Sequence, residues 1–511
     1  MAHDPIAAET TPQGDHREPR FAFAADERAA QAAIDAHRAR TGRAPNVLVV
    51  LMDDVGWGDF GCYGGGVAVG APTPHIDRLA GRGLRLTSCY SEPSCTPSRA
   101  TLLTGRYPQR HGLQRPPMYG NPGGLQGEVT LAAMLSEAGY ATQAVGKWHL
   151  GENVESQPQH VGFDDFYGFL SVSDMYSEWR DPYFFPEIVD SPERTEWVRN
   201  LPFEKCFVHA ERGGELELVE EVTIPVLSLL DEMWCSYSED FLRRMAGADR
   251  PWFLYHNTRG AHFDNYPKEE YRGSSPARHP YKDTIVELDD IVGRLVAALE
   301  ETGQLDDTLV IVTSDNGPEM ETWPDAAYTP FRCSKGSTWE GGVRVPAVVV
   351  WPGMVEAGRV SDGIVSFCDL VPTALRLAGA EDRLPTDRFI DGVDQASFLL
   401  AGDQHSNRKY HHYWMGPTYS GVRCGEFKML LASTTDDPHD VHNPGGFSGV
   451  TQSYSYARLY NLWLDPKETR SYMIRKLAYQ QAFTSGIASH LRTYATYPPK
   501  HIAGMGRVSA G

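Results

Sequence analysis

Short, continuous apolar runs recur along the chain, and each of them ends in polar residues. Residues 47–52 form one such run, and others lie in the segments ATQAVGKWHLG, PWFLYHNTRGAH, TLVIVTSDNGPE and VPAVVVWPG. Runs without polar alternation are typical of strands that are buried on both faces of a sheet. Segments with helical patterns lie between them, at residues 130–138, 284–301 and 369–378. Alternating strands and helices predict an α/β fold with a large, mostly parallel sheet flanked by helices.

The pattern changes at three places and predicts three parts. Residues 1–45 read as an N-terminal arm, with a peripheral helix at residues 24–40. Residues 46–394 form the large α/β domain, in which an insertion at about 163–235 either covers a pocket or forms a solvated lobe. Residues 395–511 form a smaller α+β domain, whose segments SGVRCGEFKMLLAS and ARLYNLWLDPKE predict an antiparallel sheet.

Composition restricts the partners and the compartment. The 511 residues are 41% apolar and 22% charged, which is ordinary for a globular protein, and the formal net charge of −20 disfavours nucleic acid and anionic membranes. An anionic substrate would therefore need basic residues gathered at its site. No apolar run approaches the roughly 20 residues that span a membrane. The first residues lack the pattern of a signal peptide, so the cytoplasm is expected rather than the periplasm or secretion.

Hard oxygen ligands follow two of the predicted strands. Asp53 and Asp54 are adjacent carboxylates at the end of a buried run, and Asp315 and Asn316 end another run in VTSDNG. Ligands in open α/β sheets bind outside the C-terminal ends of the strands, so these side chains are expected to meet. Three carboxylates and an amide suit Ca²⁺ or Mg²⁺ rather than Zn²⁺. A solvated pair of acids and an ordinary Asn-Gly turn are the alternatives.

Cys95 lies at the start of a predicted helix, and its neighbours in the sequence are not those expected around a structural thiol. Pro97 fits the first helical turn, which places Cys95 at or next to the N-cap, and Arg99 follows one turn later on the same side. A guanidinium beside free backbone N–H groups suits a tetrahedral oxyanion such as sulfate or phosphate. A soft thiolate would match hard oxygen ligands and Ca²⁺ poorly. The eight cysteines contain no C-x-x-C pair, so neither a disulfide scaffold nor a zinc ribbon is expected.

The segment CTPSRATLLTGRYPQRHG resembles the signature of the type I sulfatases, which belong to the alkaline phosphatase superfamily. The segments DDVGWGDFGCYGG, GKWHLG and SDNGPE match that family in the expected order, and the resemblance extends from about residue 45 to LYNLWLDPKE. It implies an alkaline-phosphatase-like fold. It also implies that a formylglycine-generating enzyme converts Cys95 to formylglycine, an aldehyde whose hydrate supplies hard oxygens in place of sulfur.

The resemblance assigns a role to each matching position of this chain. It implies a divalent cation, Ca²⁺ before Mg²⁺, held by Asp53, Asp54, Asp315, Asn316 and the modified Cys95. It implies catalytic roles for six residues: Cys95 as nucleophile, Arg99 beside its hydrate, Lys147 and His149 on the sulfate and the hydrate, Lys335 on the sulfate and the leaving oxygen, and His262 as the proton donor to the leaving group.

Two of these role assignments also predict local structure. Lys147 and His149 are two residues apart, so in an extended segment they would face the same side. His262 lies in RGAHFDNYP, where the family's nearby proline is displaced to Pro267, so this loop is expected to differ in shape. His256, inside the run WFLYHN, reads as a core histidine.

The predicted reaction is arylsulfatase-like hydrolysis of a small sulfate monoester, which releases inorganic sulfate and an alcohol or phenol. The alternatives are a phosphoester or phosphonate hydrolase of the same superfamily, a carbohydrate sulfatase, and a non-catalytic anion-binding relative that keeps the Cys95 thiol. Side chains that either bind the leaving group or form core are Tyr167, Trp179, Tyr183, Phe184, His411 and His412. The sequence predicts neither the natural substrate nor the oligomeric state.

Overall fold

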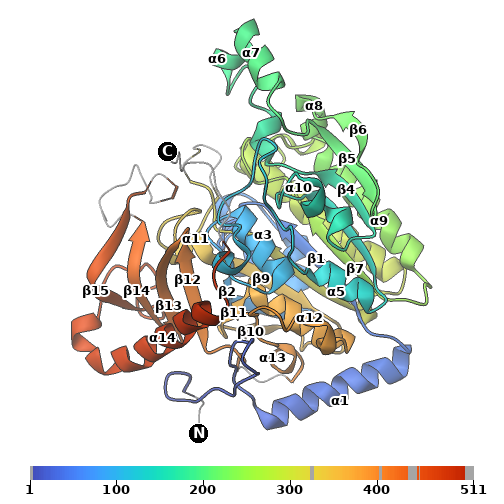
Figure 1. Cartoon of the computed structure of the whole chain (residues 1–511). Coiled ribbons are helices and arrows are strands. Elements are labelled where there is room, and N and C mark those ends of the chain that lie inside the picture. The colour runs from blue at the N-terminus through green and yellow to red at the C-terminus, as the bar shows by residue number, and fades with distance from the viewer. Residues whose placement is uncertain are drawn as a thin grey trace.

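The computed structural model describes residues 4–320, 322, 327–401, 405–434, 446–447 and 449–500. Within these residues eleven strands form one sheet in the order β10-β2-β9-β8-β1-β7-β3-β4-β5-β6, with β11 paired to β2 (Figure 1). Its strands are β1 (Asn46–Met52), β2 (Leu84–Tyr90), β3 (Ala141–Lys147), β4 (Asp165–Phe169), β5 (Cys206–Glu211), β6 (Glu217–Glu221), β7 (Trp252–Asn257), β8 (Thr308–Ser314), β9 (Arg344–Val350), β10 (Arg359–Ser361) and β11 (Val365–Ser366).

The centre of the sheet is parallel. Strands β8, β1, β7, β3 and β4 are successive parallel neighbours, so their C-terminal ends meet at one edge. Strand β9 runs antiparallel to both β8 and β2, and β5 and β6 extend the other side of the sheet in antiparallel pairing. The prediction of a large mixed, mostly parallel sheet is confirmed.

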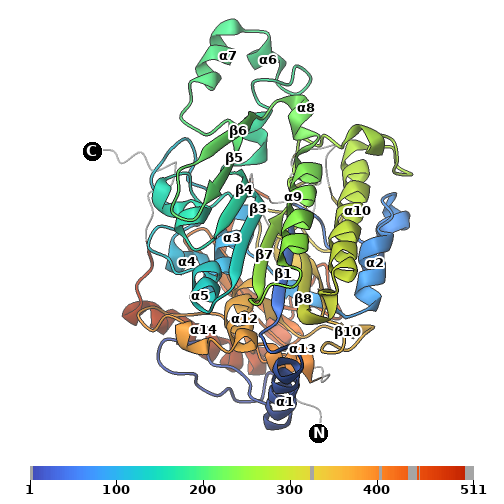
Figure 2. The same cartoon turned by 90° about the vertical axis from the view of Figure 1, so that its right-hand side faces the viewer.

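Both faces of the sheet are covered, which explains the unbroken apolar runs. In β1, Val47, Val49 and Leu51 pack into a core on one face and Leu48, Val50 and Met52 into a core on the other. The first core lies under α3 (Cys95–Thr104), α5 (Leu131–Glu137), α12 (Leu370–Ala378) and α13 (Ala396–Leu400). The second lies under α2 (Pro74–Gly81), α9 (Leu230–Met245) and α10 (Pro280–Glu301), which stand together in Figure 2. The three predicted core helices correspond to α5, α10 and α12.

The arm carries the predicted peripheral helix, which is α1 (Ala24–Thr41). Residues 163–235 supply β4, β5 and β6 to the sheet, together with the short helices α6 (Pro186–Val189), α7 (Pro192–Arg199) and α8 (Ile224–Leu227). Helices α6 and α7 project from the molecule in both views (Figures 1 and 2). This segment is therefore partly sheet and partly a projecting lobe, and its extent as an insertion stays a prediction.

A second sheet of four antiparallel strands lies on the C-terminal side, as predicted. Its order is β12 (Tyr410–Met415), β13 (Thr418–Cys424), β14 (Phe427–Thr434) and β15 (Thr451–Asn461). Phe483 of α14 (Gln480–Thr496) packs into the core of this sheet with Val422 and Phe427. The eight cysteines are all free. Among the described residues, no helix combines the length and the apolar composition needed to cross a membrane.

Candidate active site

The predicted site residues meet where the parallel strands end. Asp53 and Asp54 follow β1, Asp315 and Asn316 follow β8, Lys147 is the last residue of β3, and His262 lies in the loop after β7. These four strands are neighbours in the order β8-β1-β7-β3. The sheet therefore brings together residues that are far apart in the sequence.

The acidic residues form the base of the site. One carboxylate oxygen each of Asp53, Asp54 and Asp315 and the Sγ atom of Cys95 all lie within 4.8 Å of one another, and all four residues are buried. The Asn316 side chain donates from Nδ2 to Asp54 Oδ1 at 2.7 Å. Oδ1 of Asn316 and Oδ1 of Asp53 are buried without a hydrogen-bond partner. Buried oxygens of this kind need a positive partner, so the geometry suits a hard divalent cation.

The acids do not ionise equally. Burial raises the pKa of Asp54 to about 6, and the charge of Asp53 adds to that effect against Lys335. Burial also raises the pKa of Asp315 to about 7, again with Asp53 contributing. Burial opposes the ionisation of Asp53 as well, but Lys147 and the other positive groups outweigh it and hold its pKa well below its usual range. A cation among these oxygens would favour the ionised form of all three carboxyl groups.

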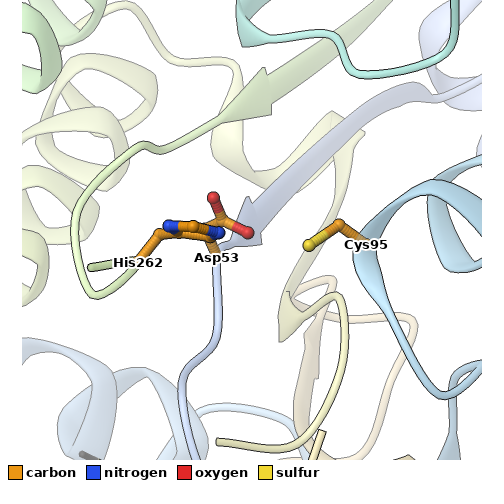
Figure 3. A group of neighbouring side chains, drawn as sticks. All are labelled: Asp53, Cys95 and His262. Atoms are coloured by element: carbon orange, nitrogen blue, oxygen red, sulfur yellow. The ribbon is translucent and has the colours of Figure 1, made fainter. Parts of the chain in front are cut away.

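Cys95 is the first residue of α3, directly after the N-cap Ser94. Figure 3 shows its Sγ atom directed toward Asp53, with His262 on the other side of that carboxylate. Burial raises the pKa of the Cys95 thiol well above its usual range, and the charge of Asp315 raises it further. Sulfur at this position is therefore a neutral thiol rather than a nucleophilic thiolate.

Arg99 connects α3 to three strand ends. Its Nε and Nη2 atoms lie 3.0 and 2.8 Å from Asp315 Oδ2. Its Nη1 donates to the carbonyl of Lys147 at 3.0 Å and to Oδ1 of Asn257 at 2.9 Å. Burial disfavours the charge, but Asp315 and Asp53 outweigh this and raise the pKa of Arg99. The guanidinium is thus fixed in place beside the thiol-bearing helix.

Two lysines lie over the acids. Lys147 Nζ is 2.6 Å from Asp53 Oδ2 and 3.7 Å from Cys95 Sγ. Lys335 Nζ is 2.8 Å from Asp54 Oδ2. Burial works against the Lys335 ammonium, but the charge of Asp54 prevails and raises its pKa well above the usual range. Both ammonium groups border the same small space as Cys95, and together with Arg99 they concentrate positive charge in an acidic protein.

Two histidines complete the predicted set. His262 Nε2 lies 3.8 Å from Asp54 Oδ2, and its Nδ1 lies 2.7 Å from the carbonyl oxygen of Phe263, so Nδ1 carries a hydrogen. Burial lowers the pKa of both His262 and His149 well below the usual range, and Lys147 lowers it further in each case. Both ring nitrogens of His149 are buried without a partner.

The expectation that Lys147 and His149 share one face of an extended segment is wrong in detail. His149 has a φ of 58°, so the chain leaves the extended conformation directly after β3. The carbonyl of His149 accepts from Thr96 Oγ1 at 2.9 Å, which ties this turn to α3. Together with the hydrogen bond from the His149 N–H to the carbonyl of Leu170 at 2.9 Å, this contact fixes the backbone at His149.

Two polar residues that were not predicted belong to the surroundings of the site. Asn257 orients Arg99 and ends the apolar run of β7, so a polar residue at a strand end was the available signal. Burial raises the pKa of Asp174, while Lys147 and Lys335 lower it, so this carboxyl lies within electrostatic reach of both lysines. No sequence pattern singled out Asp174.

Most of the residues that were considered as possible contacts for the leaving group are packed against other side chains of the protein. Tyr167 stacks on Tyr237 with centroids 4.3 Å apart, and Trp179 packs under the guanidinium of Arg180. Tyr183 is 83% exposed, and Phe184 beside it is also exposed. His411 and His412 are buried, stacked on Tyr90 and His490 respectively. His256 is a core histidine, as predicted, and its Nδ1 lies 2.8 Å from Ser238 Oγ.

A second group of possible metal ligands is less suited to a cation. Glu18, Asp391 and His490 offer ligand atoms within 4.8 Å of one another in the interior. Arg110 lies 3.0 Å from the Asp391 carboxylate, and burial lowers the pKa of His490 well below its usual range, with the charges of Arg110 and Arg408 lowering it further. Two guanidinium groups therefore already compensate these acids.

Comparisons with known proteins agree with this geometry. The sulfatase family model matches residues 45–380, and the model for the putative sulfatase AslA C-terminal domain matches residues 420–495. N-acetylgalactosamine-6-sulfatase of Canis lupus familiaris is 34% identical, covering 83% of this chain and 81% of that protein. Arylsulfatase A of Homo sapiens is 35% identical and covers 83% of each chain. The crystal structure of PsFucS1 sulfatase from Pseudoalteromonas sp. superposes with a TM-score of 0.93 at 38% identity, covering 97% of this chain and 100% of that one.

Proposed function

The chain belongs to the sulfatase family and is a sulfuric ester hydrolase, and from this premise we propose that it acts through a formylglycine made from Cys95 and a bound Ca²⁺ ion. One observation carries the proposal: the buried Cys95 thiol lies within 4.8 Å of three carboxylates. A thiolate nucleophile is not stabilised by such neighbours, because their negative charge opposes ionisation of the sulfur. An oxygen-bearing group at this position would fit them.

The ligand chemistry supports calcium. Asp53, Asp54, Asp315 and Asn316 would hold the ion through oxygen atoms only, two of which are buried without a hydrogen-bond partner. Oxygen ligands without nitrogen or sulfur favour Ca²⁺ or Mg²⁺ over Zn²⁺. When bound, the ion supplies positive charge that polarises the sulfate ester and favours ionised oxygen nearby.

Formylglycine at position 95 would supply, as its hydrate, a hydroxyl nucleophile and a second hydroxyl that lets the enzyme regenerate the aldehyde. The residues of the chain prepare this position. Arg99, held by Asp315 and Asn257, fixes positive charge next to the first turn of α3. His149, whose ring nitrogens have no other partner, is placed to accept a proton from a group at position 95.

The basic residues would bind the sulfuryl group and the leaving oxygen. Lys147 and Lys335 approach from β3 and from the loop before α11 (Glu340–Val343), on opposite members of the acidic pair. Charges fixed in advance around a reacting anion are commonly the largest contribution to catalysis. His262 Nε2 lies 3.8 Å from Asp54 Oδ2, and one of its ring nitrogens lies within 4.8 Å of both Cys95 Sγ and an Asp53 oxygen (Figure 3). We assign to His262 the transfer of a proton to the leaving alcohol; because Nδ1 already carries the hydrogen that it donates to Phe263, this role requires that Nε2 be protonated in the substrate complex.

The leaving group is an aryl or a sugar alcohol. Arylsulfatase A and N-acetylgalactosamine-6-sulfatase are both relatives of similar identity, so each name favours one of these classes. Aryl sulfates are our first candidate and sulfated sugars the second. Rates on a panel of sulfated phenols, sugars and simple alkyl esters would separate the two, and aryl phosphates in the same panel would measure any phosphatase side activity.

Replacement of Cys95 tests the proposal directly. Cys95→Ala is expected to lose nearly all turnover of 4-nitrophenyl sulfate, because no oxygen nucleophile can form at position 95. The variant should keep its fold and most of its Ca²⁺ affinity, since the four oxygen ligands remain; circular dichroism and calorimetric titration check these points. In the active wild type, the tryptic peptide that contains residue 95 should have the mass of formylglycine. Full activity of Cys95→Ala, or an unmodified thiol in active enzyme, would overturn the proposal.

A further inference from the structure

The loop that carries His262 has no regular secondary structure, so something else must fix the imidazole. The loop leaves β7 at Asn257 and is anchored at its start by the Thr258 N–H, which donates to the carbonyl of Leu51 at 3.1 Å. Ala261, directly before the histidine, has a φ of 74°, in the left-handed region. A side chain outside the loop holds this conformation.

Asp231 is that side chain. It lies in the first turn of α9 and is 7% exposed. Its Oδ1 accepts the backbone N–H of Arg259 at 2.8 Å, and its Oδ2 accepts the backbone N–H of Gly260 at 2.7 Å. Two successive N–H groups bound to one carboxylate fix the direction of the chain. The loop is thus clamped two residues before His262.

The packing around Gly260 is tight. A Cβ atom on Gly260 would lie 2.6 Å from Thr284 Cγ2 and 3.0 Å from Asp231 Oδ2. Beyond the clamp, the Ala261 N–H donates to Oδ1 of Asn265 at 3.2 Å, and Nη2 of Arg259 donates to the carbonyl of Asp264. The backbone before His262 is therefore pressed against α9 and α10, with the Asp231 carboxylate as its main polar support.

We propose that Asp231 is a positioning residue for catalysis, which acts by holding the His262 imidazole at the leaving oxygen. The inference rests on the proposed function, specifically on proton transfer from His262 to the leaving alcohol. The hydrogen bonds of Asp231 go to the backbone at residues 259–260, and its effect on His262 passes through that backbone. A small shift of a proton donor lowers the rate chiefly for leaving groups that need the proton.

This dependence on the leaving group gives the test. We compare kcat/KM on 4-nitrophenyl sulfate, whose phenol departs readily as an anion, with kcat/KM on unsubstituted phenyl sulfate. Asp231→Asn keeps the shape of the side chain but presents an amide N–H to one of the two backbone donors. We expect its loss on phenyl sulfate to exceed its loss on 4-nitrophenyl sulfate by about tenfold or more, a selective loss that His262→Ala should share.

Asp283 offers a matched control. It lies in the first turn of α10, is 3% exposed, and accepts two backbone N–H groups, from Gly273 at 2.8 Å and Ser275 at 2.9 Å. These two residues lie in the same connection between β7 and α10 as His262, but they follow the short helix Glu269–Tyr271 and are at least 11 positions beyond the histidine. Asp283→Asn should lower thermal stability to a degree similar to Asp231→Asn, while the ratio of the two kcat/KM values stays as in the wild type.

Each other outcome counts against the inference. A uniform loss on both substrates, or no loss, in Asp231→Asn would overturn it. If that variant does not fold, Gly260→Ala displaces the same backbone while the carboxylate remains, and is judged by the same ratio. An unchanged ratio in His262→Ala would reject the role of His262 and with it that of Asp231, whereas the sulfatase activity itself is judged separately by Cys95→Ala.

Discussion

At the scale of single residues, the site depends on buried charges that neutralise one another in pairs. Lys147 pairs with Asp53, Lys335 with Asp54, and Arg99 with Asp315. Loss of one member of a buried pair leaves an uncompensated charge, so each of these residues is needed for stability as well as for chemistry. Substitution of a neutral residue that orients one of these charged side chains separates the effect on stability from the effect on catalysis more clearly.

Asn257 is such a residue. Its Oδ1 accepts from Arg99 Nη1, and its Nδ2 donates to the carbonyls of Val145 and Tyr255 at 3.2 and 3.1 Å. Asn257→Ala should lower the free energy of unfolding by about 1–3 kcal/mol, because buried groups lose their partners. It should also lower kcat/KM by roughly 10- to 100-fold, because Arg99 loses one of the bonds that fix it beside position 95. Urea denaturation and steady-state kinetics measure the two effects.

Asn46 provides the comparison for Asn257. Asn46 is also buried, but it lies at the N-terminal end of β1, whereas Asn257 lies at the C-terminal end of the neighbouring β7. Asn46 donates to Thr308 Oγ1 at 3.3 Å and accepts the Trp252 N–H at 3.2 Å. Asn46→Ala should lose a similar amount of stability with near wild-type kcat/KM. Equal losses of kcat/KM in both variants would show that Asn257 has only a structural role.

The sequence predicted residues whose chemistry is visible locally and missed those defined by neighbours. Asp53, Asp54, Asp315 and Asn316 were predictable because hard oxygens follow apolar runs whose C-terminal ends meet in a parallel sheet. The role of Asn257 depends on the distant Arg99, 158 positions earlier in the chain, and pairings of that separation have no local signal.

At the scale of secondary structure, the end of β3 is shaped by close approach of the chain to neighbouring strands. Gly146, directly before Lys147, has a φ of 92°, and a Cβ at this position would lie 1.7 Å from the carbonyl oxygen of Asn257. A residue with a side chain would push β3 away from β7 and displace Lys147. The apolar run predicted the strand, but not this departure from regular geometry or the positive φ of His149.

Gly146→Ala should therefore be much more harmful than an alanine at another left-handed glycine. Gly139 has a φ of 91° with no atom near the position of its Cβ. Gly139→Ala should cost about 1–2 kcal/mol of unfolding free energy, from backbone strain alone. Gly146→Ala adds overpacking and should cost about 2–5 kcal/mol in total, with a lower kcat/KM. Equal stabilities of the two variants in urea denaturation would contradict this explanation.

At the scale of the whole molecule, the C-terminal sheet supports the loop that carries Lys335. The Thr338 and Ser420 hydroxyls lie 2.6 Å apart, and Trp339 Nε1 donates to the carbonyl of Thr434 at 2.9 Å. The sequence predicted an antiparallel sheet here but not its contact with the site, because the partner residues lie about a hundred positions away. The division into an arm and two domains, and the cytoplasmic location, stay predictions.

A buried lysine on β14 links the C-terminal sheet to α11 and the segment before it. Lys428 Nζ lies 3.1 Å from Glu340, 2.8 Å from Glu468 and 2.7 Å from the carbonyl of Thr338, and all three charged side chains are fully buried. Lys428→Met should lower the free energy of unfolding by about 3–5 kcal/mol, because Glu468 loses its counter-charge and Glu340 keeps Arg344 but loses the lysine. Urea denaturation should show this loss, and kcat/KM should fall as the Lys335 loop loosens.

Two further variants separate loss of charge from loss of packing. Lys268 also bridges two carboxylates, Glu232 at 3.2 Å and Glu270 at 2.7 Å, but its side chain is 24% exposed, so Lys268→Met should cost less than about 1 kcal/mol. Adding Glu468→Gln to Lys428→Met removes one stranded carboxylate and should recover part of the lost stability. If Lys428→Met is no more harmful than Lys268→Met, the buried ion pairs do not hold the C-terminal sheet to the catalytic region, and the Lys335 loop must be fixed by its hydroxyl and indole contacts alone.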